Sequence, residues 1–217
     1  MTAENCSVAT NFTFLGLSDR RHVQQGLFVL FLLVYGITVV ASVGMILLIK
    51  VDPRLHTPMY YFLANLSLLD ILCPSVTVPK MLENLLTEKH SISYIGCALQ
   101  LYFLVALVGT EVFLLSVMAY DRYVAICFPL RYTLIITKVR CVQLTAGTWV
   151  AGFLNSLLHT VSTFRLSFCK SNQVNQYYCD IPPVVALSCS STYVAEMLIL
   201  VEAGILGSSA FLVIPLS

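Results

Sequence analysis

The segment Gly26–Ile49, GLFVLFLLVYGITVVASVGMILLI, decides the fold class of this chain. It contains no charged residue, and at about 1.5 Å of rise per residue a helix of this length reaches roughly 36 Å. Such a helix crosses a hydrocarbon core about 30 Å thick with some tilt. We therefore predict a transmembrane helix here and expect lipid to be the solvent for much of the chain.

The composition of the whole chain supports this interpretation. Of its 217 residues 58% are hydrophobic and 11% are charged, less than half the share of about 25% that is usual in soluble domains. A soluble protein needs a charged surface to stay dispersed, and this chain could not build one. The formal net charge is +1 and no basic run occurs, so nothing in the sequence indicates a nucleic-acid partner.

Four further apolar segments follow the first, separated by polar stretches. Together the five predict an all-α membrane protein with transmembrane helices at residues 26–49, 58–82, 95–120, 141–161 and 193–217. We assign the other segments to an extracellular tail (1–25), cytoplasmic links (50–57 and 121–140), an extracellular link (83–94) and an extracellular loop with disulfides (162–192). Because the last segment is still apolar at Ser217, we expect a truncated chain or a fragment of a longer one.

Two glycosylation sequons indicate which side of the membrane the first residues occupy. Lysines and arginines divide evenly between the two faces, so the positive-inside rule does not decide the orientation. Asn5-Cys6-Ser7 and Asn11-Phe12-Thr13 both fit the N-x-S/T pattern, whose acceptors are used on the lumenal side. We therefore predict glycans on Asn5 and Asn11, an extracellular N-terminus and a place in the plasma membrane.

The distribution of the cysteines also favours an extracellular position for these segments. No CxxC or HExxH pattern occurs, so a zinc or redox site is not expected. Cys169, Cys179 and Cys189 lie in one polar stretch, and Cys97 begins an apolar run. This distribution suggests disulfides on an oxidising face of the membrane.

Two acidic residues, Asp70 and Glu111, fall at mid-depth inside the second and third predicted spans. Asp70 lies about 18 Å along the second helix and Glu111 about 15 Å from the cytoplasmic end of the third, so their depths are similar. A carboxylate in lipid costs at least about 2.5 kcal/mol, so both should face the bundle interior. Two nearby carboxylates invite a shared proton or a cation such as Na⁺. A single protonated acid bonded to a neighbouring hydroxyl or to backbone is the other interpretation.

Asp121, Arg122 and Tyr123 stand where the third span is expected to meet cytoplasmic water. One interpretation is an ordinary interfacial ion pair with an aromatic anchor, which contributes only about 0–1 kcal/mol. The other is a latch, in which Arg122 is held by Asp121 in one state and released toward a cytoplasmic partner in another. A ligand could then shift the equilibrium between the two states.

Three long sequence motifs resemble those of one protein family. They are LHTPMYYFLANLSLLD (Leu55–Asp70), MAYDRYVAICFPLRY (Met118–Tyr132) and YYCDIPPVVALSCS (Tyr177–Ser190). Together with the opening sequon and FLGLSD (Phe14–Asp19), they identify the chain as similar to the odorant receptors among the rhodopsin-like G-protein-coupled receptors. The resemblance covers essentially the whole chain.

This resemblance implies a rhodopsin-like seven-helix bundle, of which five helices are present. It implies a receptor that binds small volatile organic molecules and activates an olfactory stimulatory G protein, with Arg122 as the transducing arginine. By the same resemblance Cys97 pairs with Cys179, and Cys169 with Cys189. Asp70 and Glu111 match the acids of the family at the middle of the membrane.

The sequence departs from the family pattern at two points. Met45 follows Gly44 where the family usually has asparagine, which removes a polar partner expected near Asp70. Spans six and seven are also absent from this chain, and activation in the family depends on span six moving away from span three.

A pocket for a small volatile molecule should be mostly apolar with one or two polar groups. The outer halves of the third, fourth and fifth spans supply candidates at helical spacing. We predict that the ligand contacts residues from this set: Leu101, Leu104, Val105, Val108, Gly109, His159, Glu202, Leu206 and Gly207. A hydrogen-bonded interfacial role is an equal alternative for His159.

No enzymatic motif such as GxSxG or a phosphate-binding glycine loop is present, so we do not expect an enzyme. The favoured function is an odorant receptor without a cofactor other than a possible Na⁺. One alternative is a non-signalling fragment or pseudogene product. The other is a proton- or ion-coupled transporter, which would use intramembrane acids but predicts inverted repeats and broken helices.

Overall fold

The computed structural model describes residues 11–14, 21–86, 91–167, 173–174, 178–189, 191–201 and 204. Its main elements are four long helices: α1 (Arg21–Val51), α2 (Pro58–Leu86), α3 (Tyr94–Cys127) and α5 (Lys138–Phe164). All four are long and apolar enough to cross a membrane. A further helical stretch covers residues 193–201. The predicted all-α membrane architecture is thus confirmed.

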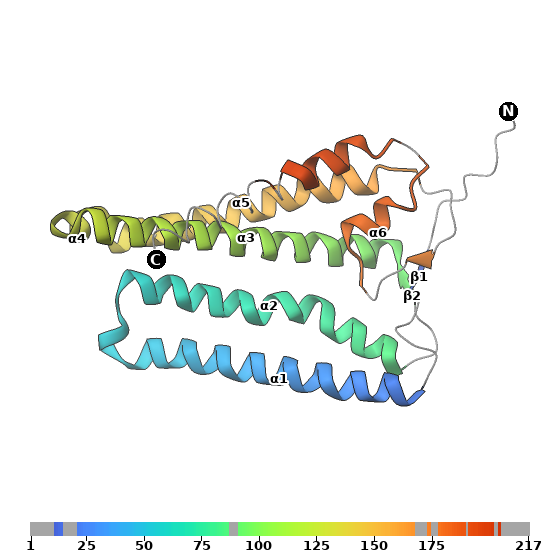
Figure 1. Ribbon diagram of the computed structural model, residues 1–217, viewed down its shortest axis with the longest axis horizontal. Helices are drawn as coiled ribbons and strands as arrows, with labels where there is room; N and C mark the ends of the chain where they lie inside the picture. Colours follow the sequence, from blue (N-terminus) through green and yellow to red (C-terminus); the bar gives the residue numbers. More distant parts are fainter. Residues whose placement is uncertain are drawn as a thin grey trace, which may run out of the picture.

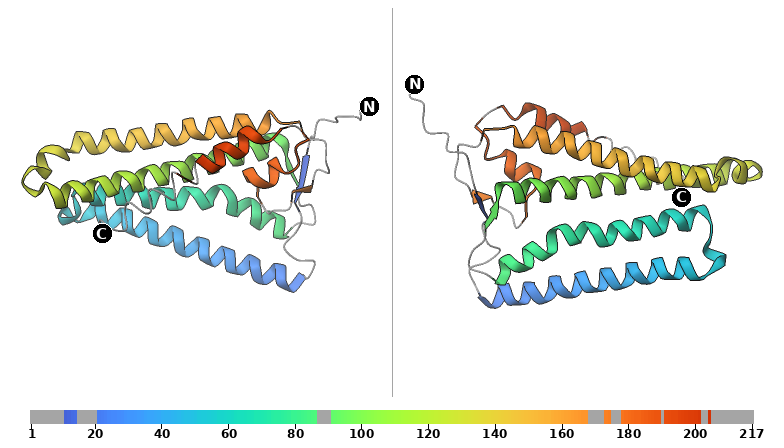
Figure 2. Two further views of the ribbon diagram at one scale, coloured as in Figure 1. Left: turned by 45° about the horizontal axis from the view of Figure 1, so that its top comes forward. Right: turned by 180° about the vertical axis from the view of Figure 1, so that it is seen from behind.

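The long helices lie side by side in a sheaf, as Figures 1 and 2 show. α1 packs on α2, α2 on α3, and α3 most extensively on α5. The short elements η1 (Pro53–Leu55), η2 (Pro129–Arg131) and α4 (Tyr132–Ile135) connect helices at one end. Strands and α6 (Ile181–Val185) occupy the opposite end.

Helix ends differ from the boundaries drawn by hydropathy. α1 begins at Arg21 instead of residue 26, and α2 runs to Leu86 instead of residue 82, through Pro74 and Pro79. α5 spans residues 138–164 instead of 141–161. Hydropathy reports where lipid ends, whereas a helix continues until its backbone is capped. The hydroxyl of Thr137, for example, accepts a bond from the backbone N–H of Arg140 at the start of α5.

The largest difference concerns α3. It continues past Tyr120 to Cys127, so Asp121 and Arg122 lie within the helix and not in a link of residues 121–140. The apolar residues after Tyr123 allow the helix to continue. Pro129 then ends it, because the residue before a proline is disfavoured in helical geometry.

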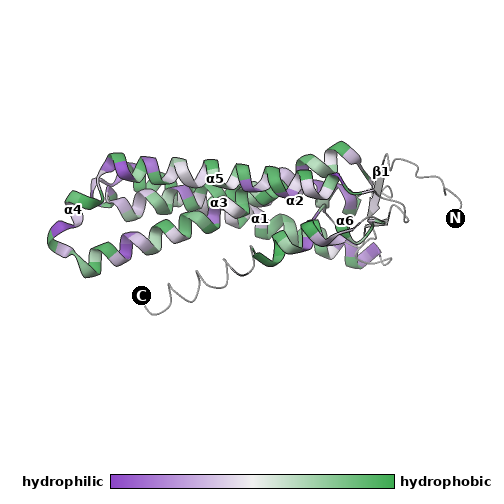
Figure 3. Ribbon diagram, turned by 90° about the horizontal axis from the view of Figure 1, so that it is seen from above, coloured by the Kyte–Doolittle hydropathy of each residue, from purple (hydrophilic) through white to green (hydrophobic). Residues whose placement is uncertain are grey.

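The outer faces of the helices are apolar. On α1 the exposed fractions of Leu33, Ile37 and Val40 are 58%, 68% and 73%, and Figure 3 shows hydrophobic colour along the lengths of the long helices. In water such surfaces would drive aggregation. They suit a protein whose solvent is hydrocarbon.

Small residues bring α3 and α5 together. A Cβ built on Gly109 would lie 3.6 Å from the Cα of Gly152. The hydroxyl of Thr110 donates to the Ala106 carbonyl at 2.7 Å, and the hydroxyl of Ser156 donates to the Tyr102 carbonyl. Close backbone approach through small residues is the usual basis of helix association in membranes, where lipid is as apolar as leucine.

A three-stranded sheet closes the end opposite α4. Strand β1 (Asn11–Phe14) lies in the middle, antiparallel to β2 (Ser91–Ser93) and parallel to β3 (Gln173–Val174). Asn11 pairs with Ser93, and Phe14 with Val174. The segments assigned to a tail, a link and a loop are therefore joined by backbone hydrogen bonds, which the sequence analysis did not foresee.

The contact between α3 and α5 predicts a steric effect at Gly152. A methyl group there would overlap the hydroxyl of Thr110 and lie 2.7 Å from the Ala106 carbonyl oxygen. We expect Gly152→Ala to lower the free energy of unfolding by about 1–3 kcal/mol. Thermal unfolding of the purified protein in detergent measures this effect.

Gly147 on the same helix is the matched control, because no atom of the described residues lies within 4 Å of a Cβ added there. Gly147→Ala should leave the midpoint unchanged or raise it, since alanine is the better helix former by about 1 kcal/mol. Equal shifts for the two variants would contradict the close approach of the helices.

Candidate functional site

A disulfide fixes the end of the bundle that carries the sheet. Cys97 near the start of α3 bonds to Cys179, across 82 residues and with a Cα–Cα distance of 5.4 Å. Both cysteines are fully buried and pack with Val184 of α6. Beside them the Tyr94 hydroxyl donates to the Phe164 carbonyl at 2.9 Å. The start of α3 is thus tied to the loop and to the end of α5.

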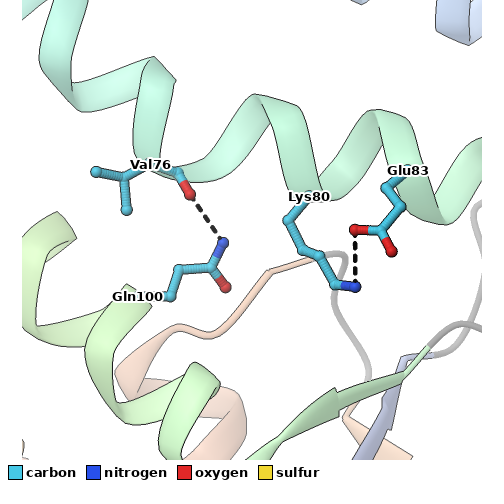
Figure 4. Close-up of polar contacts among 4 residues, drawn as sticks. All are labelled: Val76, Lys80, Glu83 and Gln100. Carbon is cyan, nitrogen blue, oxygen red and sulfur yellow. Dashed lines mark hydrogen bonds and ion pairs between the residues drawn. The ribbon is translucent and has the colours of Figure 1, made fainter.

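Gln100, one turn further along α3, joins three segments. Its side-chain oxygen accepts from the backbone N–H of Cys179 at 3.1 Å, and its nitrogen donates to the carbonyl of Val76 on α2 at 3.1 Å. Figure 4 shows the bond to Val76, with the Lys80–Glu83 ion pair of α2 nearby. Gln100 is 8% exposed, so its amide is satisfied by protein groups on both sides. Gln100 was not among the residues predicted from the sequence, although a glutamine inside an apolar helix is a recognisable signal of a buried polar contact.

An apolar cluster lies next to the disulfide, about one turn further along α3. Leu101, which is fully buried, packs with Ile181 and Val185 of α6 and with Ala195 of the fifth helical segment. Val105 and Ile199 lie against this cluster. We call these six residues the outer cluster.

Leu101 and Val105 were expected here from the sequence, whereas the contribution of α6 was not. The helix begins after Asp180, whose carboxylate accepts from the N–H of Ile181 at 2.8 Å, and two prolines follow. An aspartate before prolines is typical of a helix start, so this signal was present in the sequence.

Other predicted ligand residues lie elsewhere or outside the described part of the chain. Gly109 meets Gly152 in the α3–α5 contact, and His159 of α5 is 2% exposed. Leu104 is half-buried, and Val108 is 39% exposed. The described residues do not include these predicted ligand contacts: Glu202, Leu206 and Gly207.

Asp70 and Glu111 lie on the neighbouring helices α2 and α3, close enough for their charges to interact. Cys73, one turn from Asp70, is within electrostatic reach of both. Asp70 is exposed and Glu111 half-buried. Across the described residues, no three His, Cys, Asp or Glu side chains gather as they would around a transition metal. The two carboxylates are hard oxygen donors, which suit an alkali or alkaline-earth cation.

Asp121 lies at the other end of α3 and is 3% exposed. Its carboxylate accepts a 2.8 Å hydrogen bond from the hydroxyl of Tyr132 in α4. The expected ion pair with Arg122 is not formed: the Arg122 side chain is exposed, and Lys80–Glu83 is the one ion pair within the described residues. Consecutive helical residues point in different directions, so Asp121 turns inward and Arg122 outward.

The bond to Asp121 has a consequence for Tyr132. Burial raises the pKa of the Tyr132 hydroxyl, and so does its hydrogen bond to the Asp121 carboxylate. Because the folded-state pKa is raised, the bond contributes its full stability below the ordinary tyrosine pKa of about 10. That contribution is lost only as the pH rises through the higher folded-state value. The contact is therefore insensitive to physiological changes in pH.

The remaining predicted sites divide between described and undescribed parts of the chain. Tyr123 is 40% exposed and packs edge-to-face on Phe128. Cys189 has an exposed thiol, but its expected partner Cys169 lies outside the described residues, as does Asn5. That second disulfide and the glycans stay predictions.

Comparisons with known proteins agree on one group. A family model described as 7 transmembrane receptor (rhodopsin family) matches residues 41–216. The chain is 51% identical over 215 residues to olfactory receptor 5M5 of Mus musculus, covering 99% of this chain and 68% of that relative. It is 46% identical over 217 residues to olfactory receptor 5J2 of Homo sapiens, covering 100% of this chain and 70% of that relative.

A third relative, olfactory receptor 5F1 of Homo sapiens, is 48% identical over 206 residues, which cover 94% of this chain and 65% of that protein. The chain thus spans about two thirds of the length of these relatives.

The position of Gln100 predicts a strong polar effect at the disulfide end. Gln100→Leu keeps the side-chain size but leaves the buried N–H of Cys179 without its acceptor. We expect a loss of about 1–3 kcal/mol in the free energy of unfolding, the cost of one unsatisfied buried group. Thermal unfolding in detergent with the disulfide intact gives the measurement.

Gln143→Leu is the control, because Gln143 is an exposed glutamine of α5. It should change the midpoint little, since surface substitutions usually stay within about 0.5 kcal/mol. A Gln100→Leu protein as stable as the control would show that the bonds at Gln100 contribute nothing.

Proposed function

Because this chain belongs to the olfactory receptors of the rhodopsin family of seven-transmembrane receptors, we propose that it detects small volatile organic molecules and activates the olfactory stimulatory G protein. The observation that carries this proposal is the identity of about half of all residues over nearly the whole chain. The family consists of receptors and not of enzymes. The comparisons reported above give no support to the alternative transporter function.

The proposed orientation places the N-terminus outside the cell, in the plasma membrane. Its support is that β1, from the N-terminal segment, pairs with β2, which directly precedes α3 and the Cys97–Cys179 disulfide. Disulfides form and persist on the oxidising side of a membrane. The sequons at Asn5 and Asn11 belong to the same segment. Asp121 and α4, at the other end of α3, then face the cytoplasm.

The proposed ligand site is the outer cluster. Leu101, Val105 and Ile199 supply apolar surface from two helices, and α6 covers it from the extracellular side through Ile181 and Val185. A small volatile molecule offers little besides apolar area, so burial against such a wall is its main source of affinity. Leu104 and Val108 stay candidates on α3, and Glu202, Leu206 and Gly207 stay candidates on the fifth segment.

The proposed coupling element is a competition for Asp121. Tyr132 holds the carboxylate by a hydrogen bond, which leaves the Arg122 guanidinium exposed toward a cytoplasmic partner. If Tyr132 released Asp121, its buried charge would be uncompensated and would favour pairing with Arg122 instead. The latch thus has two discrete arrangements, and a ligand acts by favouring one of them.

A cyclic-AMP reporter in cells that express the chain tests the function against a panel of odorants. At least one odorant should raise the signal above that of untransfected cells. Silence of this chain alone, with protein at the surface, would favour the non-signalling alternative, and silence also of a form extended to the length of its relatives would contradict the proposal. In this assay Tyr132→Phe should weaken the response roughly 10- to 100-fold, because a hydrogen bond to a charged group contributes about 1.5–3 kcal/mol.

Tyr123→Phe is the matched control for the latch. It removes a hydroxyl from the same segment but keeps the ring that packs on Phe128. A response that is lowered equally by both variants, or by neither, would remove the competition for Asp121 from the mechanism.

We also propose that Asp70 and Glu111 hold Na⁺. The support is a pair of interacting carboxylates at similar depth on adjacent helices. At ten times the dissociation constant, Na⁺ would stabilise the folded protein by about 1.4 kcal/mol. The unfolding midpoint should therefore be higher in sodium chloride than in choline chloride of equal ionic strength. Asp70→Asn should remove the difference, and an unchanged difference in that variant would refute the site.

A further inference from the structure

A groove lies at the Asp121 end of the bundle, on the side away from the outer cluster. It has a volume of about 1040 Å³ and is lined by α1, α2, α4 and α5. Pockets that take small molecules usually measure about 300–1,000 Å³, so the groove is large enough for part of a lipid. None of the roles proposed above uses it.

The walls of the groove are apolar, and its rim is basic. Ile46, Leu68 and Val142 line the part that lies within the spans. Lys50 in the last turn of α1 and Lys138 in the first turn of α5 stand at the rim, both exposed. Among the residues that the structure describes, no aspartate or glutamate lines the groove.

The acid nearest in sequence, Asp52, is not part of the lining. Its carboxylate accepts from the backbone N–H of Arg54 within η1. The two ammonium groups at the rim are thus not neutralised by a lining acid, and the first N–H groups of α5 add positive potential beside Lys138.

We propose that this groove is a binding site for an anionic phospholipid of the leaflet on the Asp121 side. The phosphate lies between Lys50 and Lys138 at the level of the headgroups, and one acyl chain follows the apolar wall between α1, α2 and α5. Basic pockets between helices at this depth attract acidic headgroups, at about 1 kcal/mol for each lysine near the surface. Under the orientation proposed above, this leaflet is the cytoplasmic one.

The site borders the coupling element. Tyr132, which donates to Asp121, also lines the groove, together with Ile136 and Thr133 of the same link. Ile136 is 5% exposed and packs in the cluster that includes Val124 of α3. A bound acyl chain therefore contacts the segment whose position decides whether Tyr132 reaches Asp121.

Native mass spectrometry of the purified chain in detergent tests the proposal without any G protein, so its failure is separate from a failure of the signalling function. The probes are palmitoyl-oleoyl phosphatidylserine and the matching phosphatidylcholine, each titrated from submicromolar concentration. The wild-type chain should retain phosphatidylserine at least tenfold better than phosphatidylcholine. Equal retention of the two lipids would overturn the proposal.

Two double variants distinguish lipid binding in the groove from nonspecific electrostatic attraction to this end of the protein. Lys50→Gln with Lys138→Gln removes the basic rim and should lower retention of phosphatidylserine about 30-fold, with retention of phosphatidylcholine unchanged. Arg54→Gln with Arg140→Gln removes the same charge from exposed residues at this end that do not line the groove. That control should keep the preference, and equal losses in both would overturn the site.

A third variant tests the acyl-chain position. Ala64 lies in the wall and is half-buried, so Ala64→Trp fills the groove without changing its charge. Retention of phosphatidylserine should fall several-fold although both lysines are present. Retention equal to wild type, in a variant with an unchanged unfolding midpoint, would show that lipid does not enter the groove.

Discussion

A backbone in hydrocarbon has no water to bond to, so each segment that crosses the membrane must satisfy its own N–H and C=O groups. This constraint explains why the chain is built from long helices and why its strands are confined to one end. It also leaves the helices without a hydrophobic force that pulls them together. What joins them is close contact of small residues and the few polar side chains that the spans contain, most of them around α3.

α3 is the element on which the others depend. Gly109 and Thr110 bring it against α5, and Gln100 links it to α2 and to the loop. The disulfide at Cys97 fixes its first turns. The bond from Tyr132 to Asp121 fixes its last turns to α4. A helix that is held at both ends and packed along its length can transmit a small displacement as a rigid body, which is what a receptor that binds at one surface and couples at the other requires.

The two ends of α3 differ in their chemistry. At the disulfide end the contacts are the disulfide, the backbone pairing of the sheet, and the hydrogen bonds that Gln100 and Tyr94 make to backbone groups. At the Asp121 end the contact is a single side-chain hydrogen bond from Tyr132, beside the exposed Arg122 and next to the groove that Tyr132 also lines. We therefore propose ligand binding at the disulfide end and coupling to the partner at the Asp121 end.

The sequence by itself determined that the chain lies in a membrane, how many apolar segments it has and to which family it belongs. These properties depend on composition and on long continuous sequence motifs. It also placed Cys97 and Leu101 near the start of the third helix, since each lies at a fixed distance along a predictable helix, but it put Asp121 in a link where the structure has helix. Tertiary structure decided the rest. Tyr132 replaced Arg122 as the partner of Asp121 because Pro129 turns the chain back and brings residues 11 apart into contact. β1 joined β2, and α6 covered the outer cluster, through pairings between segments far apart in the chain. Hydropathy carries no information about such pairings, because they depend on which backbone groups are left unsatisfied when the helices have packed.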